Sequence, residues 1–226
     1  MKPTNLKRWP GRLAATGLLM LAAGCGGLLP KPAPQPVFYV LEGVATQVAL
    51  PVLAARPAAP TLIVDPAHAA AGYDSARIVY VRKPHQLEVY AHSEWVDAPA
   101  RLLGPLVAAA AERSGAFRAV LRAPAAARAD LRLDTELVRL QQEFGTGPSR
   151  VRLTLRATLS DSQTRQVLAQ REFDRTLPAA SEDAYGGVQA ANLALQEVLD
   201  ELARFCAQAA SAWVAPRGAV AGALPK

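Results

Sequence analysis

A stretch of strict two-residue alternation constrains the fold of this chain more than any other feature. From 151 to 159, every odd position is apolar and every even position is polar or charged. This period is typical of a β-strand with one buried face and one solvated face. Strand-like segments flank it at 130–144 and 167–176, and turn-forming residues at 145–148 and 161–163 separate the three. The sequence therefore predicts an antiparallel three-stranded meander.

The polar positions of this meander carry charges of opposite sign on neighbouring strands. The middle strand contributes Arg152 and Arg156, and the outer strands contribute acidic residues, namely Asp134, Glu136, Glu172 and Asp174. Cross-strand pairs of this kind contribute about 0.2 to 1 kcal/mol each and help to fix the register. The apolar phase of the first strand slips after Leu137, which predicts a β-bulge near that residue.

Upstream residues predict further strands. Apolar segments at 37–41 and 61–65 predict two separate strands. The segments 77–81 and 86–90 flank the short stretch 82–85, which contains Pro84, as the two arms of a β-hairpin flank its turn.

Two amphipathic segments predict helices that close the core. The first follows Asp97, a residue type that caps helices, and ends near residue 115. Pro105 within it predicts a kink or a later start. The second begins near Ser181 and carries apolar residues at three-to-four spacing, interrupted by Asn192. We therefore predict an α+β fold, a single domain in which an antiparallel β-sheet packs against two main helices.

The N-terminal residues have the order of a secretory signal peptide. Cationic side chains precede an apolar run at 13–23, which is too short to cross a bilayer because a spanning helix needs roughly 20 residues. The run ends in Leu-Ala-Ala-Gly-Cys, which resembles a lipobox, although Ala22 stands where a large aliphatic residue is usual. This resemblance predicts a signal peptide over 1–24, cleavage between Gly24 and Cys25, and acyl chains such as palmitate on Cys25. A plain secreted protein with a chance cysteine is the alternative.

Proline spacing and composition divide the rest of the chain. Residues 25–36 carry a proline at every second position from Pro30, which predicts an extended tether between lipid and domain. The domain itself is expected to cover 37–212, and 213–226 is expected to be a flexible tail. Gly26 in place of Asp indicates, by resemblance to enterobacterial sorting rules, the periplasmic face of the outer membrane.

Neither the charge nor the cysteines indicate a nucleic-acid-binding protein or a disulfide-stabilised protein. Lys and Arg number 25 against 19 Asp and Glu, but four of the cations lie in the signal peptide, which leaves 21 against 19. The basic pI is therefore a poor argument for binding nucleic acid, and no such partner is predicted. With Cys25 acylated, Cys206 has no partner for a disulfide, and its apolar surroundings predict a buried side chain.

Residues that catalyse reactions or bind metals do not converge in this sequence. The three histidines are His68, His85 and His92, and the last two fall on opposite faces of a regular strand, so they cannot share a metal. The sequence contains no Cys-x-x-Cys, His-Glu-x-x-His, Gly-x-Ser-x-Gly or phosphate-binding glycine loop. We predict no catalytic residue, no cofactor and no metal, and a hydrolase is the least favoured class.

The side chains that remain unexplained are concentrated between residues 71 and 103. The candidate interaction residues there are Tyr73, Asp74, Arg77, Trp95 and Arg101. Aromatic residues and arginines make good interface anchors when they are exposed. For Trp95 we favour a different interpretation, in which the indole fills the core where a strand passes into a helix.

These residues also carry a family resemblance. The segments that carry it are Phe38–Leu41, Tyr73–Tyr80, Glu94–Asp97 and Asp130–Asp134. In this order, behind a lipobox and a proline-rich spacer, they resemble the ABC-type transport auxiliary lipoproteins, including the paraquat-inducible lipoprotein C type. The resemblance implies an α+β domain that assists an MCE-type (mammalian-cell-entry) ABC transporter moving lipids between the two membranes. It implies no catalytic residues.

Two functional hypotheses follow. The first is a non-enzymatic envelope lipoprotein that binds the periplasmic part of an MCE-type transporter, with a ring of identical copies as a further hypothesis. The second is a periplasmic carrier that itself holds a lipid or another small ligand. A carrier requires an apolar cavity, and the sequence neither shows nor excludes one.

Overall fold

A computed structural model describes residues 34–42 and 59–214, so the predicted signal peptide, Cys25 and most of the predicted tether and tail lie outside the described residues. The domain forms one compact unit that begins at Pro36. None of the helices in the described ranges is long and apolar enough to cross a membrane. In chain order the elements are β1 (Val37–Tyr39), β2 (Thr61–Val64), β3 (His68–Ala69), β4 (Arg77–Val81), β5 (Glu88–Trp95), α2 (Pro99–Arg113), β6 (Ala119–Arg122), β7 (Leu131–Glu143), β8 (Arg150–Asp161), β9 (Val167–Pro178) and α3 (Ala184–Ala212).

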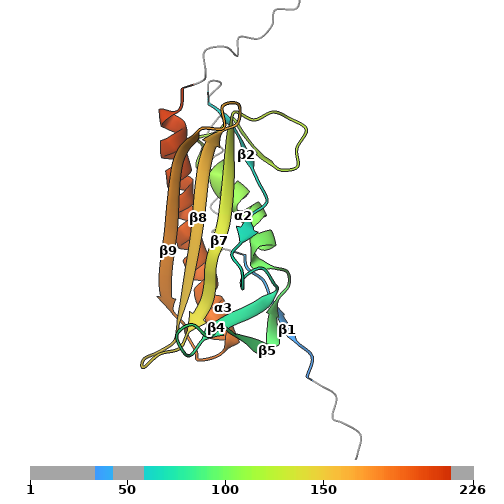
Figure 1. Cartoon of the computed structure of the whole chain (residues 1–226), viewed down its shortest axis with the longest axis vertical. Helices are drawn as coiled ribbons and strands as arrows, with labels where there is room; N and C mark the ends of the chain where they lie inside the picture. Colours follow the sequence, from blue (N-terminus) through green and yellow to red (C-terminus); the bar gives the residue numbers. More distant parts are fainter. Residues whose placement is uncertain (1–33, 43–58, 215–226) are drawn as a thin grey trace, which may run out of the picture. The chain divides into compact units, whose positions relative to one another are not determined.

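The predicted meander forms the long half of the sheet (Figure 1). β8 pairs antiparallel with β7 on one side and with β9 on the other. The register between β7 and β8 shifts between Leu137 and Arg139, which confirms the predicted bulge. Because of this shift, Leu137 and Leu140 are both buried although they differ in parity, so the apolar face stays continuous.

Charged pairs cross the outer face of the meander, as predicted for most of these residues. Arg156 pairs with Glu136 at 2.8 Å and with Glu172 at 3.0 Å, so it joins all three strands. Arg152 pairs with Asp174 at 2.8 Å. These side chains are half-exposed, so each pair adds little stability and serves mainly to fix the register.

Asp134 does not join these pairs, which corrects the prediction. The register places it opposite Thr158 and not opposite an arginine. Asp134 lies beside Asp65, which itself forms an ion pair with Arg132. Burial, and then the hydrogen bond and charge of Asp65, raise the pKa of the Asp134 carboxyl.

Short strands make up the other half of the sheet, which is mixed and not antiparallel throughout. β2, β3 and β4 pair in parallel with successive parts of β7. The β4–β5 hairpin is antiparallel, as predicted, whereas β1 runs parallel to β5 and β6 parallel to β2. The sequence predicted neither β3 nor β6, because strands of two and four residues show too little periodicity. The α+β class of the fold is confirmed.

The helices pack on one face of the sheet (Figure 1). α3 lies against β8 and β9, and α2 lies against α3 and the short strands. The apolar side chains of β7 and β8 that point toward the helices are fully buried and include Leu131, Leu133, Leu137, Leu153, Leu155 and Leu159. Asp183 caps α3, because its carboxylate accepts the N–H of Gly186 at 2.9 Å.

The start of α2 differs from the prediction. Ala98 is the N-cap residue, and the carboxylate of Asp97 caps no helical N–H. Asp97 accepts the N–H of Ala98 at 2.7 Å and the Nε–H of Arg101 at 2.8 Å. Pro99 sits at the first helical position, where its fixed φ suits the helix and its missing N–H costs nothing. The helix then continues through Pro105, so Pro105 does not delay its start.

Asn192 interrupts the apolar stripe of α3 because its side chain holds the end of β1. The side-chain oxygen of Asn192 accepts the N–H of Glu42 at 2.8 Å, and its amide nitrogen donates to the carbonyl of Val40 at 3.2 Å. The same nitrogen donates to the carbonyl of Val188, one turn earlier in α3, at 3.0 Å. One amide thus fastens the first described strand to the last helix.

Cys206 is fully buried in α3, as predicted. Burial raises the pKa of its thiol to about 12, so the reactive thiolate is scarce at neutral pH.

Candidate interaction surface

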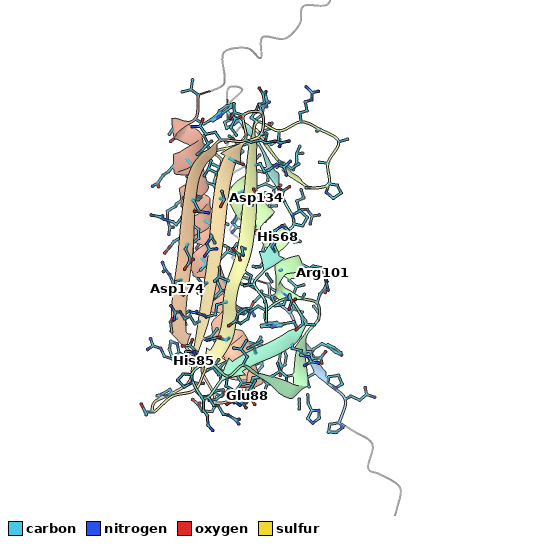
Figure 2. The ribbon with its side chains drawn as sticks, viewed as in Figure 1. His68, His85, Glu88, Arg101, Asp134 and Asp174 are labelled. Carbon is cyan, nitrogen blue, oxygen red and sulfur yellow. The ribbon has the colours of Figure 1, made fainter. Side chains whose placement is uncertain are left out.

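The β4–β5 hairpin and β1 define one end of the domain, called here the hairpin end. β1 runs parallel to β5, with Val37 opposite Ser93 and Tyr39 opposite Trp95. The chain ahead of Val37 therefore arrives from the side on which β5 begins, which is the side of the hairpin turn at 82–87. Figure 2 shows the labelled residues His85 and Glu88 at this end.

Several exposed apolar side chains lie at the hairpin end, and others lie beside the β8–β9 turn at Val167 and Leu168. Val37 is 52% exposed, Phe38 58%, Leu87 48% and Val89 39%. We call these four residues the apolar edge. Single exposed apolar residues are normal on protein surfaces, but several on neighbouring segments indicate a surface that contacts something apolar. The sequence predicts a strand at 37–41 but carries no signal that this strand lies at the edge of the sheet.

Aromatic packing and a buried amide hold the hairpin in place. Tyr80 packs against Tyr90 with ring centroids 4.7 Å apart and ring planes tilted by 53°. The hydroxyl of Tyr90 donates to Oε1 of Gln142 at 2.9 Å, and Nε2 of Gln142 donates to the hydroxyl of Ser149 at 2.8 Å. Burial raises the pKa of Tyr90 to about 12. The hairpin is thus fixed to β7 by side chains as well as by the short β4–β7 pairing.

The charges at the hairpin turn are partly satisfied within the fold. Arg82 lies over the ring of Tyr80, 4.9 Å from its centroid, and over the ring of Phe144 at 5.8 Å. It also approaches Glu88 at 3.8 Å. The hydroxyl of Tyr80 donates to Glu88 at 3.0 Å, and this hydrogen bond raises the pKa of Tyr80. Lys83, next to Arg82, is exposed at the tip of the turn.

Three of the predicted interaction residues lie next to this end. Asp74 and Arg77 are exposed in and after the turn that leads into β4. Tyr73 is half-buried, and its hydroxyl donates to the side-chain oxygen of Gln141. Burial raises the pKa of Tyr73. Asp74 and Arg77 are therefore available to a partner, whereas Tyr73 also supports the sheet.

Trp95 and Arg101 differ from the other candidates. Trp95 is only 3% exposed, so the condition for an interface anchor is not met and the favoured interpretation of core packing holds. Arg101 is exposed on the first turn of α2 and pairs with Asp97 (Figure 2). The structure thus places Trp95 in the core and Arg101 on α2.

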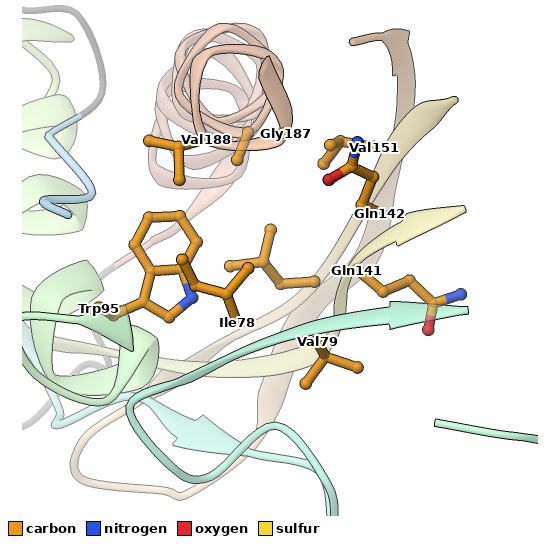
Figure 3. Close-up of a pocket in the computed structure, with 10 residues that line it drawn as sticks. Ile78, Val79, Trp95, Gln141, Gln142, Val151, Gly187 and Val188 are labelled. Carbon is orange, nitrogen blue, oxygen red and sulfur yellow. The ribbon is translucent and has the colours of Figure 1, made fainter. Parts of the chain in front are cut away.

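The indole of Trp95 borders the small apolar cavity drawn in Figure 3. This cavity lies between the hairpin, β7 and α3, and its lining includes Ile78, Gln142 and Val188. Its volume is about 10 Å³, which is barely enough for one water molecule. Larger hollows of about 420 to 580 Å³ contain charged side chains in their lining, such as Arg132, Asp65 and Glu143.

Metal-binding residues do not cluster in the described ranges. Within 34–42 and 59–214, no group of three His, Cys, Asp or Glu side chains lies close enough to bind a metal ion. His68 is in β3 and His85 is in the hairpin turn, at different levels of the sheet (Figure 2).

The fold and this surface define a class of protein, an α+β domain built on a long meander with an exposed apolar edge. The chain belongs to the family described as ABC-type transport auxiliary lipoprotein component, whose model matches residues 39–203. The resemblance inferred from the sequence is therefore confirmed.

Solved structures with the same fold agree with this assignment. The chain is similar to a DUF330 protein from Xanthomonas campestris, with 27% identity, 77% of this chain and 97% of that chain covered, and a TM-score of 0.65. A second solved structure, described as an uncharacterized protein, is 14% identical, covers 76% of this chain and 98% of its own, and has a TM-score of 0.58. This second likeness shows the fold alone. The comparison with curated proteins found no match.

Proposed function

We propose that this protein is a lipid-anchored periplasmic accessory component of an MCE-type ABC transport system that moves lipids or other hydrophobic molecules between the two membranes. It acts by binding other proteins and not by catalysis. The observation that carries this proposal is the family match over 39–203, which covers almost the whole described domain. Cys25 carries the anchor, on the periplasmic face of the outer membrane.

The shape of the interior supports a binding role more than a carrier role. A pocket for a drug-sized ligand has about 300 to 1,000 Å³ of mostly apolar space. The cavity beside Trp95 has about 10 Å³, and the larger hollows contain charged residues in their lining. Each of the larger hollows includes charged side chains that a lipid chain would have to desolvate, so the interior favours the carrier hypothesis less than the accessory role.

We propose that the exposed residues Asp74, Arg77 and Arg101 contact the transporter. Asp74 and Arg77 are close in sequence on the approach to β4, and Arg101 lies on the first turn of α2. Exposed charges of this kind set orientation and association rate more than affinity. A ring of identical copies is part of the proposal, because several copies would present the same residues around one partner.

Crosslinking in cells followed by purification tests this function. We expect the native chain to recover an MCE-domain protein, together with a ladder of crosslinked copies of itself. The double variant Asp74→Lys/Arg77→Glu is expected to lower the recovery of the MCE-domain protein several-fold, because it reverses both exposed charges. The matched control is Arg171→Glu, a charge reversal at an exposed position of β9. Recovery of phospholipid with an isolated monomer, and of no partner protein, would overturn the accessory role in favour of the carrier.

Labelling with a clickable fatty acid tests the anchor separately. We expect the wild-type chain to incorporate the label and the variant Cys25→Ser to lose it entirely, since Cys206 is buried and its thiol pKa is raised to about 12. An unlabelled wild-type chain, or one that retains residues 1–24, contradicts the lipoprotein assignment.

A further inference from the structure

The direction of β1 determines which end of the domain lies next to an anchored N-terminus. Because β1 is parallel to β5, the chain enters the domain at the hairpin end. A proline-rich chain rises about 3.1 Å per residue, so residues 25–36 reach at most about 35 Å. This length limits the distance between the hairpin end and the membrane, and it permits direct contact.

The opposite end of the domain is the β8–β9 turn, which lies far from the hairpin end. Leu131 at the start of β7 is opposite Asp161 at the end of β8, whereas the other end of β7 pairs with β4. The 13 residues of β7 separate these two ends by about 40 Å. An N-terminal anchor therefore holds one end of the domain near the bilayer.

The side chains at the hairpin end suit the interface of a bilayer. Phe38 and Leu87 are about half exposed, at 58% and 48%, and belong to neighbouring segments. Lys83 is exposed at the tip of the same turn, where a cation meets phosphate groups favourably. Aromatic and aliphatic side chains beside a cation are the composition of surfaces that lie in the headgroup layer.

Four carboxylates around the hairpin turn and the start of α3 are engaged within the fold, whereas Asp74 beside this end stays exposed. Glu88 accepts from the hydroxyl of Tyr80 at 3.0 Å and lies 3.8 Å from Arg82. Glu182 accepts the N–H of Ser149 at 2.8 Å. Glu143 accepts from Gln141 and Asp183 accepts from Gly186. Their charges are thus partly balanced and turned toward protein partners, which reduces repulsion by anionic lipids.

We propose that the hairpin end of this domain rests on the lipid bilayer, with Phe38 and Leu87 in the headgroup layer and Lys83 against lipid phosphates. This inference rests on the proposed lipid anchor at Cys25. It gives the domain a fixed orientation, with the hairpin end on the membrane and the β8–β9 turn directed away from it. The tether then sets only the greatest height of the domain above the bilayer.

Site-specific fluorescence on the lipidated full chain tests this orientation. Gln86 and Gln163 are exposed glutamines in turns at opposite ends of the domain, so Gln86→Cys and Gln163→Cys form a matched pair of labelling sites. Cys206 stays unlabelled because it is buried. Each variant is labelled with an environment-sensitive dye and placed in vesicles of phosphatidylethanolamine and phosphatidylglycerol, some of which carry bromine on the acyl chains.

We expect bromine-carrying lipids to quench the label at 86 by about half or more and the label at 163 by less than about a tenth. Adding Phe38→Ser and Leu87→Ser is expected to abolish quenching at 86, whereas Val167→Ser, an equally exposed apolar residue beside the other turn, is expected to leave it unchanged. Quenching at 86 that survives the double substitution overturns the role of these two side chains.

Flotation of the same vesicles separates this inference from the anchor on which it rests. If the chain floats with the vesicles but neither label is quenched, the anchor stands and the docked orientation is wrong. If the label at 86 shifts to the blue without quenching by lipid-borne bromine, the hairpin end is covered by a second copy of the chain, and the proposal fails. If the chain does not float, the anchor and the orientation both fail.

Discussion

The meander and the hairpin end belong to the same sheet but differ in which side chains they expose to solvent. In the meander, apolar side chains lie under α3 and charged pairs such as Arg152 with Asp174 cover the outside. At the hairpin end the strands are short, and the apolar edge, which includes Phe38, remains in contact with solvent. The difference indicates that the meander provides stability, whereas the hairpin end keeps a surface free for contact with other molecules.

Two phenylalanines provide the largest test of this comparison. Phe173 in β9 is 2% exposed and meets Phe205 edge to face at 5.8 Å, whereas Phe38 is 58% exposed. We expect Phe173→Ala to lower the free energy of unfolding by about 3 to 5 kcal/mol. Phe38→Ala is expected to change it by less than about 0.5 kcal/mol. Urea unfolding followed by circular dichroism measures both, and a similar loss for the two variants breaks the distinction between the regions.

Two glycines give a smaller and more local test. A Cβ on Gly186 would lie 2.4 Å from the backbone nitrogen of Ser181, whereas a Cβ on Gly145, in the turn between β7 and β8, meets nothing within 4 Å. Gly186→Ala is expected to cost about 1 to 3 kcal/mol, because the backbone ahead of α3 must move. Gly145→Ala is expected to be neutral within about 0.5 kcal/mol. Thermal unfolding compares them, and an equally stable Gly186 variant would show that the start of α3 has room.

Two aspartates on the outer face of the sheet are expected to change the free energy of unfolding in opposite directions as the pH changes, and by smaller amounts. Burial beside Asp65 raises the pKa of Asp134, so the stability linked to its protonated form is complete below the unfolded pKa and falls as the pH rises through the folded pKa. Hydrogen bonds from Arg152 lower the pKa of Asp174, so its contribution is present above the unfolded pKa and falls as the pH drops through the folded pKa.

Asparagine substitutions check these signs. At pH 7 we expect Asp134→Asn to stabilise the domain and Asp174→Asn to destabilise it, each by less than about 1 kcal/mol because both side chains contact solvent. At about pH 3 the Asp134→Asn difference should shrink toward zero, because the carboxyl is then largely protonated in both states. The Asp174→Asn difference should shrink less, because its lowered folded pKa keeps the carboxylate ionised to lower pH. Urea midpoints at the two pH values decide this, and effects of the same sign at pH 7 contradict the assigned environments.

The regular parts of the fold were predictable because they repeat a pattern over many residues. The alternation along β8 predicted the meander, and the change of apolar phase at Leu137 predicted the position of the bulge. The hairpin followed from two short apolar runs around a turn containing Pro84. The parallel pairings were not predictable, because β1, β3 and β6 have two to four residues each and their partners lie far away in sequence.

The candidate surface was only partly predictable for the same reason. Asp74, Arg77 and Arg101 are exposed, and a search for unexplained charges finds such residues. Phe38 looked like any strand residue, and only its place on an edge strand reveals that it is exposed. Asp134 was assigned to a charge pair because sequence spacing does not show that Asp65 lies beside it.

The amide of Asn192 connects the two extremes of the folded chain across 150 positions of sequence. A protein is synthesised from its N-terminus, so β1 has to wait for α3 before its last residues are fastened. The pairing of β1 with β5 can form earlier, but the contacts at Val40 and Glu42 form only once α3 is in place. Completion of the last helix is therefore the event that secures the end of the first described strand.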